Sequence, residues 1–397
     1  MRDKVKRSLA FWTLLLILVF SVCGFTNKDQ DLWKQDESQP AEYVVDEKVL
    51  EQQTQKLLAS MTLEQKVYQM FIVTPEMLTD GRAVTAFDET AASALRECPV
   101  GGLIYFTKNL TDAAQTKELL CSTQASALEI EGLPLFQCVD EEGGKVARIG
   151  NHKGFEVPKV GAMGKINTEG DAYAAGSTIG AYLRELGFTL DFAPDADVLT
   201  NPRNTVIGDR SFGRDAAQVL CYASAYSDGL HAHGLLSTFK HFPGHGATEA
   251  DTHDGFAYTD QTYEELLQAD LIPFAGAKAA GIDCVMVSHI AVPNITGDNT
   301  PCSLSYQMVT EVLRGDLAYD GIIVTDAMNM GAIVNQYASD EAAVAAVKAG
   351  VDVILMPQDL QSAAEGVLAA VRSGVISEER IDASVRRLIR VKLKMKR

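Results

Sequence analysis

Short apolar runs alternate with longer amphipathic stretches from about residue 46 to residue 397. Eight runs have the length of strands, and most are continuously apolar, which is typical of parallel strands buried on both faces. They cover residues 69–73, 102–106, 135–140, 189–193, 236–241, 284–289, 321–326 and 351–356. Stretches with helical spacing lie between them, including 111–131, 171–186, 216–233, 263–280, 305–317 and 339–349, and a final helix is expected at 377–394.

This alternation predicts an α/β protein, a single (β/α)8 TIM-type barrel over residues 46–397, because helices that join parallel strands make right-handed crossovers. An open, doubly wound sheet with an accessory domain is the alternative. The barrel is favoured because no G-x-G-x-x-G motif follows an early apolar run.

The first 24 residues have the composition of an export signal, with basic residues followed by the apolar run Leu9–Cys23. The run is shorter than the ~20 residues that a transmembrane helix needs, although an uncleaved anchor and a lipid on Cys23 stay open as alternatives. Residues 25–45 are polar and are expected to form a linker. We therefore expect an exported protein, either extracellular or anchored on the outer face of a bacterial membrane.

Charge and cysteine content exclude several classes of partner and site. The formal net charge is −18, which argues against a nucleic-acid partner because binding phosphates requires a basic surface. Six cysteines follow the signal and form no CxxC motif, which gives no support for a zinc finger or a thioredoxin-like site. Cys138 and Cys284 lie within apolar runs and are expected to be buried free thiols.

Polar residues stand at the ends of five of the apolar runs. Asp140, Lys240 with His241, His289 and Asp326 end four of these runs, and Asp195 follows the fourth run along the chain. In a barrel, catalytic groups lie at the carboxyl ends of the strands. Asp326 is therefore a candidate catalytic carboxylate, and its alternative role is to cap the next helix.

Histidines are concentrated in the Gly-rich segment from residue 240 to residue 253. We expect this segment to be a long loop over the site, because glycine and proline disfavour packing as a core element. Asp251 and His253 face the same way in an extended chain, so the carboxylate would raise the imidazole pKa and make His253 a proton donor near neutral pH. A solvated polar loop is the alternative. His245 is expected to be a mobile loop residue or to contact the loop's own backbone.

The remaining histidines and two arginines complete the set of candidates. His231 and His233 precede the fifth run, so they are expected on a helix surface away from the site. Asp140 with Arg148 could form a pair that binds hydroxyl groups of a ligand, and Arg210 offers a further cation. A structural salt bridge is the alternative for the Asp140 and Arg148 pair.

Four motifs together resemble glycoside hydrolase family 3, in its bacterial β-N-acetylglucosaminidase branch. They are Asp140-Glu-Glu-Gly-Gly with Arg148, Asp209-Arg-Ser-Phe-Gly213, Lys240-His-Phe-Pro-Gly-His-Gly246 with Asp251-Thr-His253, and Val324-Thr-Asp-Ala-Met328. The resemblance implies a retaining glycosidase in which Asp326 is the nucleophile and His253, paired with Asp251, is the acid/base. It further implies that Asp140, Arg148, Arg210, Lys240 and His241 hold the terminal sugar, and that His289 also contributes to sugar binding.

The function expected from this resemblance is an exo-acting β-N-acetylhexosaminidase that acts on carbohydrate, with peptidoglycan fragments as the expected substrate. It needs no metal or cofactor, and a monomer is favoured. One alternative is a β-N-acetylglucosaminide phosphorylase that passes the sugar to phosphate. Two more remote alternatives are a metal-dependent barrel hydrolase built on the histidine cluster and a non-catalytic sugar-binding protein.

Overall fold

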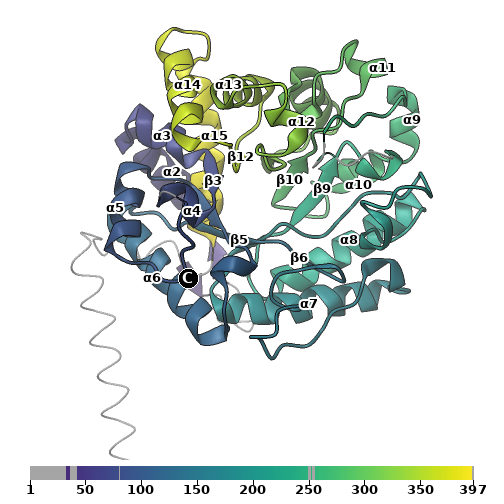
Figure 1. Ribbon diagram of the computed structural model, residues 1–397, viewed down its shortest axis with the longest axis horizontal. Helices are drawn as coiled ribbons and strands as arrows, with labels where there is room; N and C mark the ends of the chain where they lie inside the picture. The colour runs from purple at the N-terminus through teal and green to yellow at the C-terminus, as the bar shows by residue number, and fades with distance from the viewer. Residues whose placement is uncertain (1–32, 36–42, 80, 249–251, 253–254, 396–397) are drawn as a thin grey trace, which may run out of the picture. The chain divides into compact units, whose positions relative to one another are not determined.

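The computed structural model describes residues 33–35, 43–79, 81–248, 252 and 255–395 (Figure 1). The expected export signal lies outside the described residues, and so do Asp251 and His253. The chain divides into two compact units, residues 1–59 and residues 60–397. No helix within the described residues is long and apolar enough to cross a membrane.

The first unit contains a small antiparallel strand pair and most of one helix. Strand β1 (Trp33–Gln35) pairs with β2 (Tyr43–Val45), within the stretch that was expected to be a linker. Helix α2 (Glu47–Ser60) follows directly.

The described residues of the second unit form eight parallel strands, one in each of the predicted apolar runs. Five form a sheet in the order β12 (Ile354–Leu355), β3 (Phe71–Val73), β4 (Gly102–Ile104), β5 (Phe136–Val139) and β8 (Leu190–Asp191). Three form a second sheet in the order β11 (Ile322–Thr325), β10 (Cys284–Val287) and β9 (Thr238–Phe242). Their side chains are almost entirely buried, as continuous apolar runs predict.

Isolated parallel bridges join the edges of the two sheets. Leu190 bridges Leu236 where β8 meets the chain before β9, and Val324 bridges Val353 where β11 meets the chain before β12. The α/β class with parallel strands is therefore confirmed, but the ladders form two sheets instead of one continuous ring. Strands β8 and β12 have only two residues each, so the pairing between the edges of the two sheets is limited to isolated bridges.

Helices surround the strands of this unit (Figure 1). The longer ones are α3 (Leu63–Gln69), α5 (Glu89–Glu97), α6 (Ala113–Glu131), α7 (Glu169–Leu186), α8 (Ala216–His231), α13 (Ser339–Ala349), α14 (Leu360–Arg372) and α15 (Glu378–Lys394). The shorter ones are α4 (Pro75–Leu78), α9 (Tyr263–Gln268), α10 (Ile272–Gly276), α11 (Pro293–Thr296) and α12 (Gly331–Val334), and residues Gln307–Asp316 form a π-helix of ten residues. Glycine allows α7 and α8 to approach closely, since a Cβ on Gly176 would lie 1.9 Å from the Tyr226 carbonyl oxygen.

One helix prediction is wrong in extent. Residues 263–280 form the two short helices α9 and α10 instead of one long helix. Pro273 explains the break, because it has no backbone N–H to continue the earlier helix and is accepted in the first turn of a new one. The expected thiols are confirmed: Cys138 and Cys284 are buried, and the six described cysteines are all free.

Candidate active site

The predicted site residues in the described part of the chain lie at the carboxyl ends of the parallel strands or in the segments that follow these strands. Asp326 directly follows β11 and is half-buried. Its backbone N–H donates to the Val287 carbonyl at 2.8 Å, and its carboxylate accepts from the Ala327 N–H at 2.8 Å. Helix α12 has Met330 as its N-cap, so Asp326 does not cap the next helix. The strand ladder therefore fixes the position of this carboxylate at the carboxyl end of β11.

Two cations, the buried Lys240 and the largely buried Arg210, share one buried carboxylate beside this position. Arg210 donates twice to Glu142, with N···O distances of 2.7 and 2.8 Å. Lys240 Nζ lies 2.7 Å from Glu142 and 3.1 Å from Asp140. Burial alone would raise the pKa of Glu142, but Arg210 and Lys240 hold it well below its usual range. Glu142 is therefore an anion that fixes both cations in place.

The neighbouring residues of β9 reach the site because of an irregularity in the ladder. Lys240 pairs with Met286 and Phe242 pairs with Val287, which leaves His241 as the extra residue of a bulge. A bulge redirects side chains that would otherwise alternate between faces. Lys240 and His241 can therefore both contact site residues although they are adjacent in sequence.

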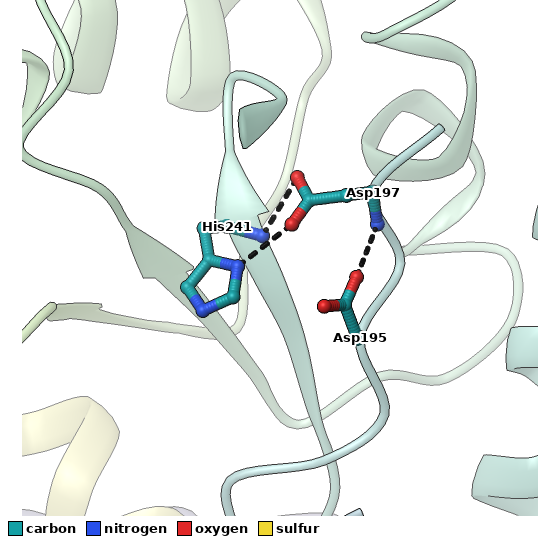
Figure 2. Close-up of side chains that lie close together, drawn as sticks. All are labelled: Asp195, Asp197 and His241. Atoms are coloured by element: carbon teal, nitrogen blue, oxygen red, sulfur yellow. Dashed lines mark hydrogen bonds and ion pairs between the residues drawn. The ribbon is translucent and has the colours of Figure 1, made fainter. Parts of the chain in front are cut away.

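His241 is a neutral ring held by a buried carboxylate. Its Nδ1 lies 2.7 Å from Asp197 Oδ2, and its backbone N–H donates to Asp197 Oδ1 at 3.2 Å (Figure 2). Burial lowers the pKa of His241 to about 4, and Arg210 acts in the same direction against the charges of Asp195 and Asp326. Nδ1 therefore donates to Asp197, and Nε2 can accept from Arg210, whose NH2 nitrogen lies 3.4 Å away.

Asp195, Asp197 and His241 form a cluster of the kind that can hold a divalent cation (Figure 2). However, the oxygens of Asp197 already accept from His241 and from the His245 N–H, and Asp195 accepts from the Asp197 N–H at 3.0 Å. Arg210 Nε lies 3.4 Å from the other Asp195 oxygen. The guanidinium therefore supplies a positive charge beside these carboxylates, and the hydrogen bonds of Asp197 support His241.

Arg148 enters the site from the hairpin of β6 (Glu141–Gly143) and β7 (Val146–Ala147). Its guanidinium lies 3.5 Å from Asp140 and 5.5 Å from the centre of the Phe106 ring. The buried carboxylate of Glu141 accepts from the N–H groups of residues 148, 149 and 150 at 2.5 to 2.9 Å. The backbone that carries Arg148 is therefore folded around an internal anion.

His289 is completely buried next to the segment that follows Asp326. Its Nδ1 lies 2.8 Å from Ser303 Oγ, and its Nε2 lies 3.0 Å from the Ala327 carbonyl oxygen. These contacts place it near the candidate nucleophile. Its expected role in binding the sugar stays a prediction.

The Gly-rich segment after residue 240 is more ordered than the sequence predicts. Phe242 and His241 belong to strand β9 and are buried, so the expectation that the whole segment forms a loop is wrong for its first residues. His245 is also buried, at 2% exposure, and its ring contacts the side chains of Thr248 and Thr252, which corrects its assignment as a mobile residue. Glycine is required here for close approach, since a Cβ on Gly246 would lie 2.0 Å from the Val198 carbonyl oxygen.

Two supporting carboxylates were not recognised from the sequence. Glu142 is hidden in a run of acidic residues, and Asp197 lies two residues after Asp195, the residue that drew attention. Both carboxylates lie two residues after an acidic residue that ends or follows a predicted strand, and this spacing is the sequence signal that could have identified them. His231 and His233 contact Asp283 and Ser177 and take no part in the site.

Comparison with known proteins gives consistent matches. Residues 62–391 match the family described as the glycosyl hydrolase family 3 N-terminal domain. The chain is 33% identical over 337 residues to beta-hexosaminidase A of Pseudoalteromonas piscicida, which covers 79% of this chain and 56% of that protein. It is 36% identical over 268 residues to beta-hexosaminidase LpqI of Mycobacterium tuberculosis, which covers 66% of this chain and 68% of that protein.

Solved structures agree with these relatives. A glycoside hydrolase family 3 beta-N-acetylglucosaminidase from Paenibacillus sp. str. FPU-7 superimposes with a TM-score of 0.79 and 38% identity, covering 84% of this chain and 62% of that one. This chain therefore spans less than two thirds of the length of that structure and of the Pseudoalteromonas relative.

Proposed function

The chain belongs to glycosyl hydrolase family 3, and on that premise we propose that it is an exo-acting, retaining β-N-acetylhexosaminidase that removes terminal β-linked N-acetylglucosamine. The observation that carries the proposal is the position of Asp326 at the end of β11, close enough for its charge to act on His241 at the end of β9. The names of the relatives, beta-hexosaminidase and beta-N-acetylglucosaminidase, support the same substrate class.

The proposed reaction is a double displacement. Asp326 attacks the anomeric carbon and forms a covalent glycosyl-enzyme while the bond to the aglycone breaks. His253, paired with Asp251, donates a proton to the departing oxygen. The same histidine then removes a proton from water, which attacks the anomeric carbon and releases Asp326. Protonation and covalent capture supply this chemistry without a metal or a cofactor.

The terminal sugar is proposed to bind against the charged groups beside Asp326. Asp140 would accept from sugar hydroxyls, and Arg148, Arg210, Lys240, His241 and His289 complete the binding set. Glu142 and Asp197 hold three of these groups before substrate arrives, so little reorganisation is needed on binding.

The finer proposals concern the fold, the natural substrate and the location. We propose that the two sheets function together as one eight-stranded barrel, which the bridges at residues 190 and 324 support. Peptidoglycan fragments are the proposed substrate, and export through the N-terminal segment would bring the enzyme to them.

The test is release of nitrophenol from 4-nitrophenyl N-acetyl-β-glucosaminide. The wild-type chain should turn it over, and Asp326→Ala should lower kcat by more than roughly 10,000-fold because the nucleophile is lost. His253→Ala should lower it by at least about 100-fold. Asp320→Ala is the matched control, since Asp320 is exposed and precedes the opposite end of β11. Full activity in Asp326→Ala would contradict the proposal.

The same assay separates the alternatives. Phosphate in the buffer should leave the rate unchanged and yield free N-acetylglucosamine, whereas formation of the sugar 1-phosphate would identify a phosphorylase. Inhibition by a chelator, reversed by added metal, would point to a metal-dependent hydrolase.

A further inference from the structure

The proposed reaction leaves one buried histidine without a role. His245 is 2% exposed, and both of its ring nitrogens have partners. Nδ1 lies 2.9 Å from Thr248 Oγ1, and Nε2 lies 3.3 Å from Thr252 Oγ1. The Thr248 hydroxyl also lies 3.0 Å from the His245 carbonyl oxygen and can donate to it.

Thr252 occupies an informative place in the chain. It stands between Asp251 and His253, the proposed acid/base pair, and its own side chain is buried at 1% exposure. Its carbonyl oxygen accepts from the Ala332 N–H at 3.2 Å, at the start of α12 in the segment that follows Asp326. The residue between the two proposed acid/base groups is thus attached both to the end of β9 and to the chain that carries the proposed nucleophile.

The His245 end of this connection is firmly held. The His245 N–H donates to Asp197 Oδ1 at 2.6 Å, and the Asn204 side-chain amide donates to the His245 carbonyl at 2.8 Å. The Asn201 N–H donates to the Gly246 carbonyl at 3.1 Å. These bonds tie the backbone at residues 245 and 246 to the chain that follows β8.

The hydrogen bonds are consistent with one neutral form of the ring. If Nδ1–H donates to Thr248, whose hydroxyl proton is directed to the His245 carbonyl, the lone pair of Nε2 can accept from Thr252. Burial lowers the pKa of His245, and the nearby His241 acts in the same direction.

We propose that His245 is a positioning residue that acts on the proposed acid/base pair through the hydroxyl of Thr252. The inference rests on the proposed function, because it assigns to His245 the placement of the proton donor and not a step of the reaction. Its consequence is specific: losing this tether should impair proton donation and leave nucleophilic attack by Asp326 intact.

Two substrates with different leaving groups distinguish a defect in proton donation from a defect in nucleophilic attack. A 2,4-dinitrophenolate departs without protonation, whereas the sugar oxygen of N,N′-diacetylchitobiose needs a proton from the acid. Damage to sugar binding or to the fold would lower kcat/KM for both substrates alike. Misplacement of the acid lowers it for the disaccharide only.

The experiment compares kcat/KM on these two substrates for Thr252→Val and His245→Asn. We expect a loss of roughly 100-fold on the disaccharide and of less than about threefold on the dinitrophenyl glycoside. Thr252→Ser restores the hydroxyl and should recover most of the disaccharide activity. Thr123→Val is the matched control, because Thr123 is a buried threonine in α6 whose hydroxyl bonds to the Leu119 carbonyl.

The outcomes are distinct. Equal losses on both substrates, or wild-type rates on both, would overturn the inference, and so would failure of Thr252→Ser to recover activity. Thr252→Val changes the side-chain volume little, so it tests the tether even if His245→Asn fails to fold. A wild-type chain inert on both substrates would instead overturn the proposed function, and this inference with it.

Discussion

At the scale of single residues, the site depends on buried carboxylates that hold other side chains in place. Glu142 contacts Arg210 and Lys240, and Asp197 accepts from His241 and from the His245 N–H. Buried charges are stable only when they are paired, so each carboxylate specifies the position of its partners. The candidate nucleophile and the sugar contacts are arranged around these internal anions.

This arrangement predicts that replacing glutamate by glutamine has a much larger effect at Glu142 than in an exposed ion pair. Glu142→Gln should lower the free energy of unfolding by about 3 kcal/mol, because it leaves two buried cations short of a partner. It should also lower kcat/KM on the order of 100-fold, as displaced binding groups do. Thermal unfolding and the nitrophenol assay measure both effects.

The control is an exposed pair of the same chemistry. Glu89 and Arg96 lie 2.7 Å apart on α5 with exposed side chains, so Glu89→Gln should lower the free energy of unfolding far less than Glu142→Gln does, because solvent screens an exposed pair. A Glu142→Gln protein as stable as Glu89→Gln would show that Glu142 does not anchor the cations.

The sequence predicts the reacting groups of the site better than their supports. Asp140, Lys240, His241 and Asp326 could be found because each lies at or next to the end of an apolar strand. The role of Glu142 could not, because its bonds to Arg210 span 68 residues and depend on how two loops meet. His245 was missed for a similar reason, since its burial depends on contacts made by the fold.

At the scale of elements, the hydrophobic pattern predicted the positions of the strands well and the extent of the helices less well. Continuous apolar runs identified all eight parallel strands, because both of their faces are covered. The pattern did not reveal the break between α9 and α10, nor that β8 and β12 are only two residues long. Those features depend on local geometry, such as the first-turn proline of α10.

Helix α15 contains a lysine, Lys392, on its buried, largely apolar side. This lysine lies near the amino ends of the strands. Lys392 Nζ lies 2.7 Å from Gln69 Oε1 and 5.0 Å from the centre of the Phe136 ring. Burial lowers its pKa to about 7, against the attraction of Glu131, from an ordinary value of 10.5. Between these two values the unfolded chain binds more protons at this position, so raising the pH stabilises the folded state.

Lys392→Met should remove that pH dependence. From pH 7 to pH 9, wild type should gain stability relative to the variant by roughly 1 kcal/mol per pH unit. The pKa of Glu131 is raised by burial to about 7, so this carboxyl is about half ionised at pH 7 and mostly ionised at pH 8 and above. Urea unfolding at pH 7, 8 and 9 measures the difference, with Lys394→Met, on the exposed side of the same helix, as control. A difference that stays constant with pH would contradict the assignment.

At the scale of the whole molecule, the proposed chemistry is confined to the second unit. The family match covers residues 62–391, and every residue proposed to touch the sugar or the reacting atoms lies between Asp140 and Asp326. The first residues instead carry the sequence features of export. Catalysis and location are therefore expected to be separable.

Removing residues 1–45 should separate them. We expect kcat/KM to stay within about twofold of the full chain, because the catalytic unit keeps its own core. In cells, the shortened protein should move from the membrane or external fraction to the cytoplasm. Cell fractionation with the nitrophenol assay measures both properties. Export of the shortened chain, or loss of its activity, would contradict this division.

The most direct test of the central claim is to trap the covalent intermediate. A 5-fluoro N-acetylglucosaminyl fluoride should glycosylate the enzyme and slow its release, because the fluorine destabilises the positively charged transition state. Mass spectrometry of the digested protein should then find the sugar on the peptide that carries Asp326. No adduct, or an adduct on another carboxylate, would contradict the assignment of Asp326 as the nucleophile of a retaining glycosidase.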